Sequence, residues 1–425
     1  MHFCYKLLTY FFYPIAHFYL IIRKQRGKEH PKRYREKLSS IKISRPDGFL
    51  LWCHVASVGE AMSVLPLIEN FEKDKKINKI LITTITLSSA QVLEKKFNQN
   101  EKITHQFLPL DIPNFVNKFL SHWSPDLSIF IDSEIWPNLI FQIKKRNIPL
   151  LLINGRITKK TFLRWKFLIN FAKKIFDKFD LCIASNKETE NYLKILGAKN
   201  IKNFGNLKFA KTKSSTKNKL ESSLINKIGN RKIWVAASTH PTEEIFCAEA
   251  HLRIKKTFNN ILTIIIPRHI NRIKTISDEL SNLNYKTTLY SNFDQINSET
   301  DILLIDAYGE TLKFYDIAKC VFLGKSLIES LVNDSGQNPI EPARLGCKIY
   351  HGPNVSNFSE IYEFLKSLNV SKEIRNSEEL SQSLVEELKN NKTVDNQIVE
   401  KIENYGVNTL NNVLKEIKIY INTQK

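Results

Sequence analysis

Short, continuous apolar runs recur along the chain from residue 48 onward, and amphipathic stretches of helical period separate them. Runs of this kind between helices are typical of strands in a parallel sheet that is covered on both faces. The pattern therefore predicts an α/β protein, with helices over stretches such as 63–73 and 88–97. The expected strands are 49–53, 79–83, 127–131, 150–153, 181–184, 232–237, 262–266, 302–305, 320–323 and 347–350.

The expected strands fall into two sets, which a polar, lysine-rich stretch at 210–231 separates. Such a composition is typical of a linker. We expect two Rossmann-like domains, 38–209 and 232–425, that face each other across a ligand cleft. The polar, helical sequence beyond residue 371 is interpreted as closing helices of the second domain.

The first 37 residues have a different character. Between Phe3 and Ile22, 16 of 20 residues are apolar and eight of these are aromatic, while residues 23–37 contain eight basic and two acidic residues. The apolar stretch is too long for a cleavable signal peptide, and no small-residue cleavage site follows it. An aromatic-rich segment with a basic flank favours membrane anchoring over 1–37. The alternative is an aromatic helix that packs on the protein body.

Composition narrows the choice of partners and metals. The 425 residues carry a net charge of +20, which favours anionic partners: nucleic acid, an anionic membrane surface or phosphorylated substrates. The six cysteines have no C-x-x-C spacing and the ten histidines no H-x-x-x-H pair. We therefore expect reduced, buried thiols and no metal site.

Polar residues at the ends of the expected strands are the candidates for chemistry, because ligands of open parallel sheets bind beyond the carboxyl ends of the strands. In "HVASVGE", Glu60 stands where a strand gives way to a helix. Its structural explanation is a capping box, in which Ser57 accepts an early helical N–H and Glu60 reaches back to the cap. Asp132 and Glu134 follow another strand, and for these acids a structural role is as open as a functional one.

The second half offers a similar set of strand-end loops. "VAASTHPTEE" places hydroxyl residues before Pro241, which suits a first helical turn whose free N–H groups attract phosphate. Arg268 in "IIIPRH" can bind a phosphate or carboxylate as a fork, and Asn338 can cap a helix whose first turn carries Glu341. Helix capping or a solvated surface position explains each of these residues equally well when it is considered alone.

Eight motifs appear in the order found in the 3-deoxy-D-manno-octulosonic acid (Kdo) transferases of lipopolysaccharide synthesis, which this sequence resembles over residues 1–365. They are "HVASVGE", "DSEIWPN", "NGRIT", "GNLKF", "AASTHPTEE", "IPRH", "YGETLKFYDIAKCVFLGKS" and "GQNPIEPARLGCKIYHGP". The resemblance implies a GT-B fold glycosyltransferase at the cytoplasmic face of the bacterial inner membrane. It implies transfer of Kdo from CMP-Kdo to a tetraacylated, bisphosphorylated lipid A precursor, with inversion and without a metal or other cofactor.

The resemblance also implies roles for particular residues. Glu60 matches the general base of the family, Glu134 an acidic residue of the acceptor-side motif, and Ser57 and Gly59 the acceptor-binding turn. The donor-binding residues that it implies are Ser238, Thr239, His240, Arg268, Asn338, Glu341, Asn206 and Lys208.

The sequence departs from the pattern of the family at four places. The usual Gly-Gly-His-Asn is Ser335-Gly336-Gln337-Asn338, and Lys325 replaces the middle residue of a Gly-Gly-Ser. Asp132 stands where Glu is usual, and Ala210 where an acid follows "NLKF". The missing His receives no role here, and these changes bear on donor contacts rather than on the reaction.

Two other classes of protein share some of these features. A nucleotide-sugar epimerase has the same paired Rossmann domains, but it has no need of an aromatic membrane segment. A basic protein that binds nucleic acid or a membrane surface would also carry the positive charge. The chain has no zinc finger and no aromatic RNP motif, so no nucleic-acid partner is expected.

Overall fold

The structure is a computed structural model that describes residues 1–98, 100–210, 219–328, 335–390 and 395–423. The chain forms two compact units, one of residues Met1–Lys213 with Tyr405–Lys425 and the other of residues Ser214–Asn404. The sequence had assigned residues 405–425 to the second domain. They pack instead in the first, because their apolar side chains are buried there.

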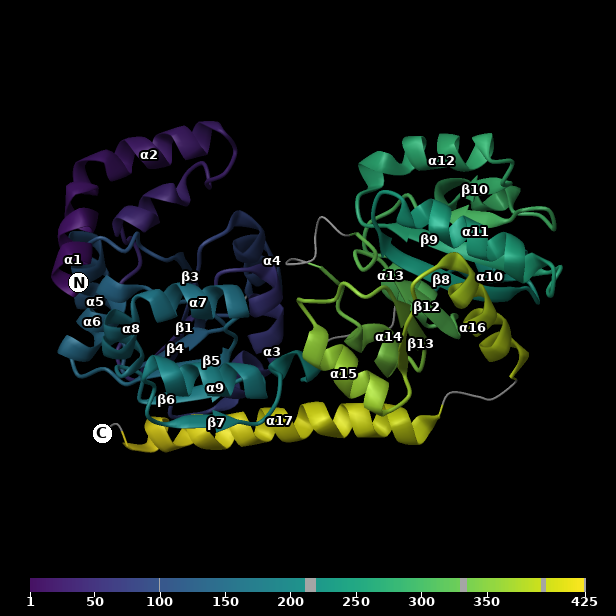
Figure 1. The fold of residues 1–425 in the computed structure, drawn as a ribbon. Coiled ribbons are helices and arrows are strands. Elements are labelled where there is room, and N and C mark those ends of the chain that lie inside the picture. The colour runs from purple at the N-terminus through teal and green to yellow at the C-terminus, as the bar shows by residue number, and fades with distance from the viewer. Residues whose placement is uncertain (99, 211–218, 329–334, 391–394, 424–425) are drawn as a thin grey trace. The chain divides into compact units, whose positions relative to one another are not determined.

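The first unit is built on a seven-stranded sheet in the order β3-β2-β1-β4-β5-β6-β7, in which every neighbouring pair is parallel (Figure 1). The strands are β1 (Leu50–His54), β2 (Lys79–Thr84), β3 (Ile103–Phe107), β4 (Leu127–Ile131), β5 (Leu150–Gly155), β6 (Leu181–Ala184) and β7 (Ile201–Asn203). From β1 the chain adds strands outward to β3 on one side of the sheet, and from β4 it adds strands outward to β7 on the other side. The direction of winding therefore reverses between β1 and β4. Ligands of doubly wound sheets bind at such a point.

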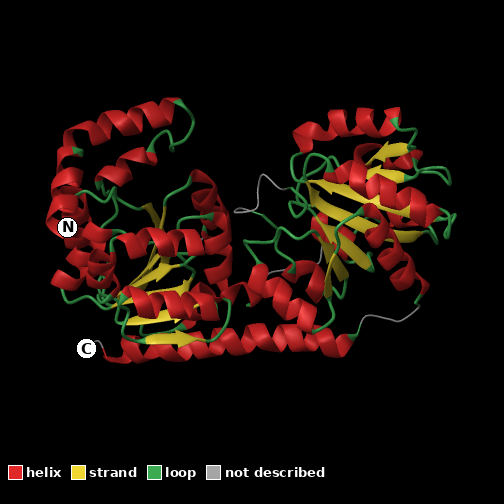
Figure 2. Ribbon diagram, in the orientation of Figure 1, coloured by secondary structure: helices red, strands yellow, loops and turns green. Residues whose placement is uncertain are grey.

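Helices cover both faces of this sheet (Figure 2). Alternate strand residues point to opposite faces, so Leu50 and Trp52 join one apolar cluster and Leu51 and Cys53 join the other. The helices are α3 (Val58–Lys73), α4 (Leu87–Phe97), α5 (Pro113–Trp123), α6 (Pro137–Lys145), α7 (Lys159–Phe167), α8 (Ile169–Phe176) and α9 (Lys187–Leu196), with the 3₁₀ turns η1 (Arg33–Leu38) and η2 (Leu207–Phe209).

The last helix, α17 (Asn396–Thr423), completes one of these layers. Its residues Val413, Ile417 and Ile421 are buried in the same cluster as α3. Lys202 of β7 forms an ion pair of 2.7 Å with Glu416, and Figure 1 shows α17 beside β7. The end of the chain is therefore part of the core of the first unit.

The second unit repeats the architecture with the parallel order β10-β11-β9-β8-β12-β13-β14. Its strands are β8 (Lys232–Thr239), β9 (Ile261–Pro267), β10 (Thr287–Leu289), β11 (Ile302–Leu304), β12 (Cys320–Leu323), β13 (Lys348–His351) and β14 (Ser371–Glu373). Its helices are α10 (Ser222–Ile228), α11 (Glu243–Lys255), α12 (Ile273–Asn282), α13 (Thr311–Tyr315), α14 (Ile340–Arg344), α15 (Ser359–Ser367) and α16 (Ser377–Lys389), with η3 (Ile270–Arg272) and η4 (Tyr290–Gln295). The prediction of two α/β domains with parallel sheets is confirmed.

Two helices at the amino terminus, α1 (His2–Phe11) and α2 (Tyr13–Gln25), lie on the first unit. The Tyr5 hydroxyl donates a hydrogen bond of 2.9 Å to the buried Asp111 carboxylate, and this contact fixes α1 to the body. Phe3 and Phe18 remain 73% and 63% exposed. None of the helices in the described residues combines the length and the apolar character needed to cross a bilayer.

Candidate functional site

The carboxyl edge of the first sheet collects most of the polar residues that the sequence singled out. Glu60 follows β1, and Asp132 and Glu134 follow β4, its hydrogen-bonded neighbour. Lys208 follows β7, and its charge acts on Asp132. The structure thus brings these four groups to one place, as the strand-end argument expected.

Glu60 is held by its own helix start. The Ser57 hydroxyl accepts the Glu60 N–H at 3.3 Å and donates to Oε1 of Glu60 at 2.9 Å. Oε2 of Glu60 accepts the backbone N–H of Ala56 at 2.7 Å, one residue ahead of the cap residue. The expected cap is therefore present, and it orients the carboxylate.

The same carboxylate has an unusual acidity. Burial, together with the neighbouring charges of Asp132 and Glu134, raises the pKa of Glu60 to about 7, although its hydrogen bonds to Ala56 and Ser57 act in the opposite sense. A carboxylate with a pKa near neutral pH suits a general base. A helix cap alone gains nothing from such a shift, because the charged form is the better cap.

Glu134 has the opposite environment. Its Oε2 accepts from the Trp136 indole N–H at 2.8 Å and lies 3.2 Å from Nε2 of the buried His54. Burial acts to raise the pKa of Glu134, but the His54 and Trp136 contacts outweigh it and the pKa is lowered. Glu134 is thus ionised beside Glu60, and two neighbouring carboxylates have their acidities separated by their surroundings.

Asp132 adopts a left-handed backbone conformation, with φ at 61°. Burial raises its pKa, and the cations Lys208 and Arg156 counteract part of that effect. Asn206 is buried and its side chain accepts the N–H of Lys208 at 3.0 Å, which caps η2. Asn206 and Lys208, predicted as donor ligands, therefore belong to the first unit, where the charge of Lys208 acts on Asp132.

Gly59 has neither a tight neighbour nor a positive φ. A Cβ built on it meets no atom within 4 Å, and the residue is exposed beside Glu60. Packing and backbone conformation thus give no reason for glycine here.

The second unit has a comparable edge. Ser238 has a left-handed backbone conformation, with φ at 55°. Thr239 is fully buried, and its carbonyl accepts the Arg268 N–H at 3.0 Å. The ring of His240 contacts that of His269. Within the described residues the Thr239 hydroxyl has no hydrogen-bond partner. A buried hydroxyl without a partner costs free energy, which a ligand atom can recover.

The start of α11 differs from the expected phosphate site. The carboxylate of Glu243 is buried there and accepts backbone N–H groups of His240, Lys325, Ser326 and Leu327 at 2.7 to 3.1 Å. Pro241 precedes the helix rather than occupying its first turn. The prediction that Pro241 lies in the first helical turn was therefore wrong. The four N–H groups that Glu243 binds come from the neighbouring loops and not from α11, so the phosphate site at this helix start stays a prediction.

The remaining donor-side residues lie on the same edge. Asn338 accepts the N–H of Ile340, the first residue of α14, at 3.1 Å, but Pro339 and not Asn338 is the N-cap residue; Glu341 is in the first turn of that helix. Lys325, at the departure from Gly-Gly-Ser, has φ at 58°. A glycine takes this conformation without strain, which explains why the family pattern prefers it.

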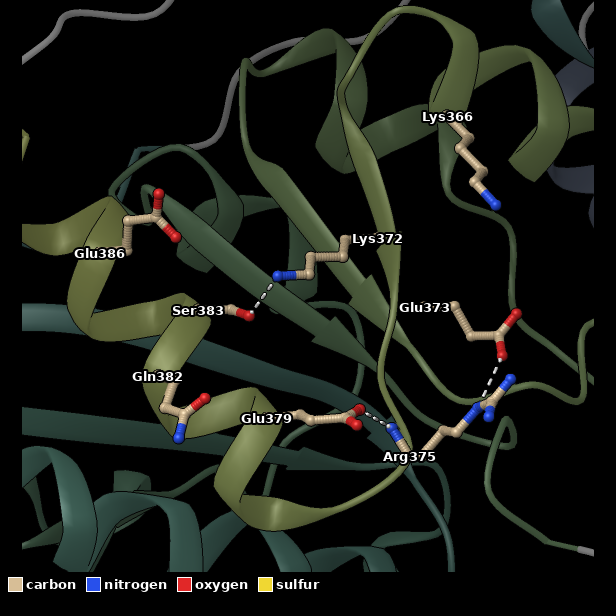
Figure 3. A pocket seen from close by; sticks show the side chains of 8 residues that line it. All are labelled: Lys366, Lys372, Glu373, Arg375, Glu379, Gln382, Ser383 and Glu386. Atoms are coloured by element: carbon tan, nitrogen blue, oxygen red, sulfur yellow. Dashed lines mark hydrogen bonds and ion pairs between the residues drawn. The ribbon is translucent and has the colours of Figure 1, made fainter.

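A further hollow on the second unit has no part in this edge (Figure 3). Lys372 donates to Ser383, Arg375 pairs with Glu373, and the Arg375 N–H is bound by Glu379. Its cations and carboxylates neutralise one another, and none of the predicted site residues lines it. We assign it no role in catalysis.

Three functional neighbours were missed from the sequence: His54, Trp136 and Arg156. Each lies within a quoted motif, yet only the order of the strands shows that they surround the acids. Among the described residues, no group of three or more His, Cys, Asp or Glu side chains is arranged to hold a metal ion. All six cysteines are free, and all but Cys4 are buried.

Two parallel-sheet α/β domains with polar carboxyl edges are the architecture of the GT-B fold. A family model described as 3-deoxy-D-manno-octulosonic-acid transferase matches residues 29–211. A 3-deoxy-D-manno-octulosonic acid transferase of Rickettsia bellii is 32% identical over 98% of this chain and 96% of its own length. The chain belongs to the Kdo transferase family, and it is a glycosyltransferase.

Solved structures agree on the fold. A glycosyltransferase from Rickettsia africae superposes with a TM-score of 0.56 at 13% identity, covering 89% of this chain and all of its own. A UDP-GlcNAc 2-epimerase from Neisseria meningitidis gives 0.57 at 13% identity, covering 87% of this chain and all of its own. The epimerase alternative thus shares the architecture, while the sequence relationship is to Kdo transferases.

Proposed function

We propose that this protein transfers Kdo from CMP-Kdo to a tetraacylated, bisphosphorylated lipid A precursor, with inversion and without a metal ion. Family membership supports the sugar that is transferred. The observation that carries the mechanism is the Glu60 carboxylate, whose pKa is raised to about 7 at the carboxyl edge of the first sheet.

In this mechanism Glu60 takes the proton of the acceptor hydroxyl as that oxygen attacks the anomeric carbon. CMP leaves with its phosphate charge, and the new bond forms on the opposite face of the sugar, which gives inversion. Ser57 and Ala56 fix the carboxylate through their hydrogen bonds. The open space at Gly59 leaves room for the acceptor next to Glu60.

The donor is proposed to bind at the carboxyl edge of the second sheet. Arg268 is exposed at the end of β9, where its guanidinium can bind a phosphate. Thr239 offers a buried hydroxyl without a partner among the described residues. Asn338 and Glu341 follow the loop at Gly336, whose N–H donates to the Lys325 carbonyl at 2.7 Å.

The lipid acceptor requires a membrane surface, and we propose that α1 and α2 lie in the cytoplasmic face of the bacterial inner membrane. Their exposed aromatic and aliphatic side chains form an apolar surface, and the basic residues of 23–37 follow it. Helices of this kind lie in the interfacial plane and are attracted to anionic lipids. Binding to anionic vesicles should therefore weaken as salt concentration is raised.

The proposal is tested by incubating the protein with radiolabelled CMP-Kdo and the tetraacylated precursor, in the presence of excess chelator. Mass spectrometry of the lipid then gives the number of Kdo units added. Labelled lipid supports the proposal. Conversion of the nucleotide sugar without lipid labelling would favour an epimerase, and strict dependence on added Mg²⁺ would contradict the metal-free mechanism.

A further inference from the structure

Seven of the basic residues between the last turn of α2 and residue 42 form two groups. In the first group, each cation is bound by a carboxylate. Nε of Arg23 and Nζ of Lys37 each lie 2.6 Å from a Glu29 oxygen, and Arg33 donates to Glu36 at 2.7 Å. These three cations hold the segment together.

The contacts of these cations fix residues 23–37 on the body of the first unit. Glu29 and Lys37 are almost completely buried, and Lys37 also donates to the Ile85 carbonyl at 2.9 Å. Arg33 reaches the His105 carbonyl of β3 at 2.9 Å and pairs with Glu94 of α4. A buried ion pair with further hydrogen bonds fixes geometry more than it adds stability.

The second group consists of Lys24, Lys32, Arg35 and Lys42. All four side chains are exposed, and no salt bridge to a carboxylate is found for them in the described part of the chain. Two of them contact the Tyr34 ring, whose centroid is 5.2 Å from Nζ of Lys24 and 5.9 Å from Cζ of Arg35. This ring orders cations that would otherwise be free to move.

These four cations line a single cavity of about 460 Å³ in the first unit. Arg33 and Glu36 also line it, but they neutralise each other. His105 adds no charge at neutral pH, because burial and the nearby Arg33 lower its pKa to about 3. The cavity therefore has an excess of four positive charges and a volume that fits a small ligand.

We propose that this cavity binds the phosphate ester group of a membrane amphiphile. Lys24 lies in the last turn of α2, the helix that exposes Phe18. An anionic group in the cavity thus stands next to an apolar surface, the arrangement that a lipid-borne phosphate needs. The source, the glycolipid acceptor or a membrane phospholipid, rests on the proposed function, whereas the phosphate chemistry does not.

The test measures flotation of the full-length protein with phosphatidylcholine vesicles that contain phosphatidylglycerol or the bisphosphorylated acceptor, at constant ionic strength. Lys32→Gln with Lys42→Gln should bind roughly 30-fold more weakly, since each cation near an anionic surface contributes about a factor of five. The matched control, Lys256→Gln with Lys274→Gln, makes the same change of charge on exposed residues of the second unit and should bind like the wild type.

A third variant separates the cavity from the overall charge. Ser40 lines the cavity and is exposed, so Ser40→Trp fills the space without changing any charge. Weaker binding of this variant supports the proposal. Unchanged binding of Ser40→Trp, or equal losses in the two lysine pairs, would mean that diffuse charge attracts the vesicle and would overturn it.

The same series identifies the source and keeps the two proposals apart. If the Lys32→Gln, Lys42→Gln variant loses binding only to vesicles with the acceptor, the cavity binds the glycolipid phosphate. If it loses binding to both vesicle types, the cavity accepts any lipid phosphate. Sugar transfer is measured separately with detergent-dispersed acceptor. If wild-type protein transfers no Kdo but the vesicle results hold, the proposed function fails and the cavity assignment stands.

Discussion

At the scale of single residues, Glu60 serves as a helix cap and is proposed to act as a base, and substitution by glutamine separates these roles. Glutamine keeps the capping contacts but cannot accept the proton. Glu60→Gln should keep the melting temperature of the wild type within a few degrees and lose roughly 10²- to 10⁴-fold in turnover. Thermal unfolding and Kdo transfer measure the two effects, and a large loss of stability with retained turnover would favour the cap alone.

The raised pKa of Glu60 also predicts how the stability and the turnover of the wild-type protein depend on pH. The pKa of Glu60 in the folded protein, about 7, is above its ordinary value of 4.5. Because the folded state then binds the proton more tightly, this group favours folding at low pH, and its contribution is lost as pH rises from 4.5 to 7. Turnover should have the opposite trend and rise towards pH 7 as the base ionises.

The charge of Glu134 is predicted to influence the pH at which turnover rises. Its negative charge is one cause of the raised pKa of Glu60. Glu134→Gln removes the charge and leaves an amide oxygen for Trp136, so the midpoint of the pH–rate profile should move down by roughly half a unit or more. An unchanged midpoint in transfer assays would show that Glu134 does not act on the base.

At the scale of elements, the polar contacts of α1 decide how the amino-terminal helices are held. The Asp111 carboxylate accepts the Tyr5 hydroxyl at 2.9 Å and the N–H groups of Asn138 and Leu139 at 3.0 and 2.8 Å. Burial raises the pKa of Asp111 to about 6. Helix α1 is thus tied to the start of α6 by a buried group.

Tyr5→Phe should loosen α1 by about 1–2 kcal/mol, because one contact to a buried carboxylate is lost. Hydrogen exchange over residues 1–25 should become faster, while the second unit exchanges as before. Tyr10→Phe is the matched control, since the Tyr10 ring is half exposed on the same helix. Equal effects of the two variants would argue against the tether.

The central strands were the elements most readily predicted from the sequence. The strands that the apolar pattern did not single out are β3, β7, β10 and β14, and all four are at the edges of their sheets. Edge strands are covered on fewer sides, and β7 and β10 have no buried residue. A strand of this kind has little apolar pattern to detect.

At the scale of the whole molecule, the return of the chain to the first unit makes that unit depend on its last residues. Ile417 is fully buried there, whereas Ile419 on the same helix is 51% exposed. Ile417→Ala should destabilise the first unit by about 2–5 kcal/mol, and Ile419→Ala by less than about 0.5 kcal/mol.

Chemical denaturation followed by tryptophan fluorescence measures this difference. Trp52 and Trp123 report on the first unit and Trp234 on the second. The Ile417→Ala transition should shift to lower denaturant in the signal of the first unit only. A shift confined to Trp234 would mean that the carboxyl-terminal helix supports the second unit.

The sequence by itself determined the two α/β domains, the central strands, the family and the polar strand-end loops, because each depends on local period or on residues close together in the chain. Only the tertiary structure decided which loops meet. Strand order brings the charges of Asp132 and Glu134 to bear on Glu60, and burial with those charges sets its acidity. The tertiary structure also decided that α17 packs in the first unit, since the sequence of an amphipathic helix does not specify which core buries its apolar face.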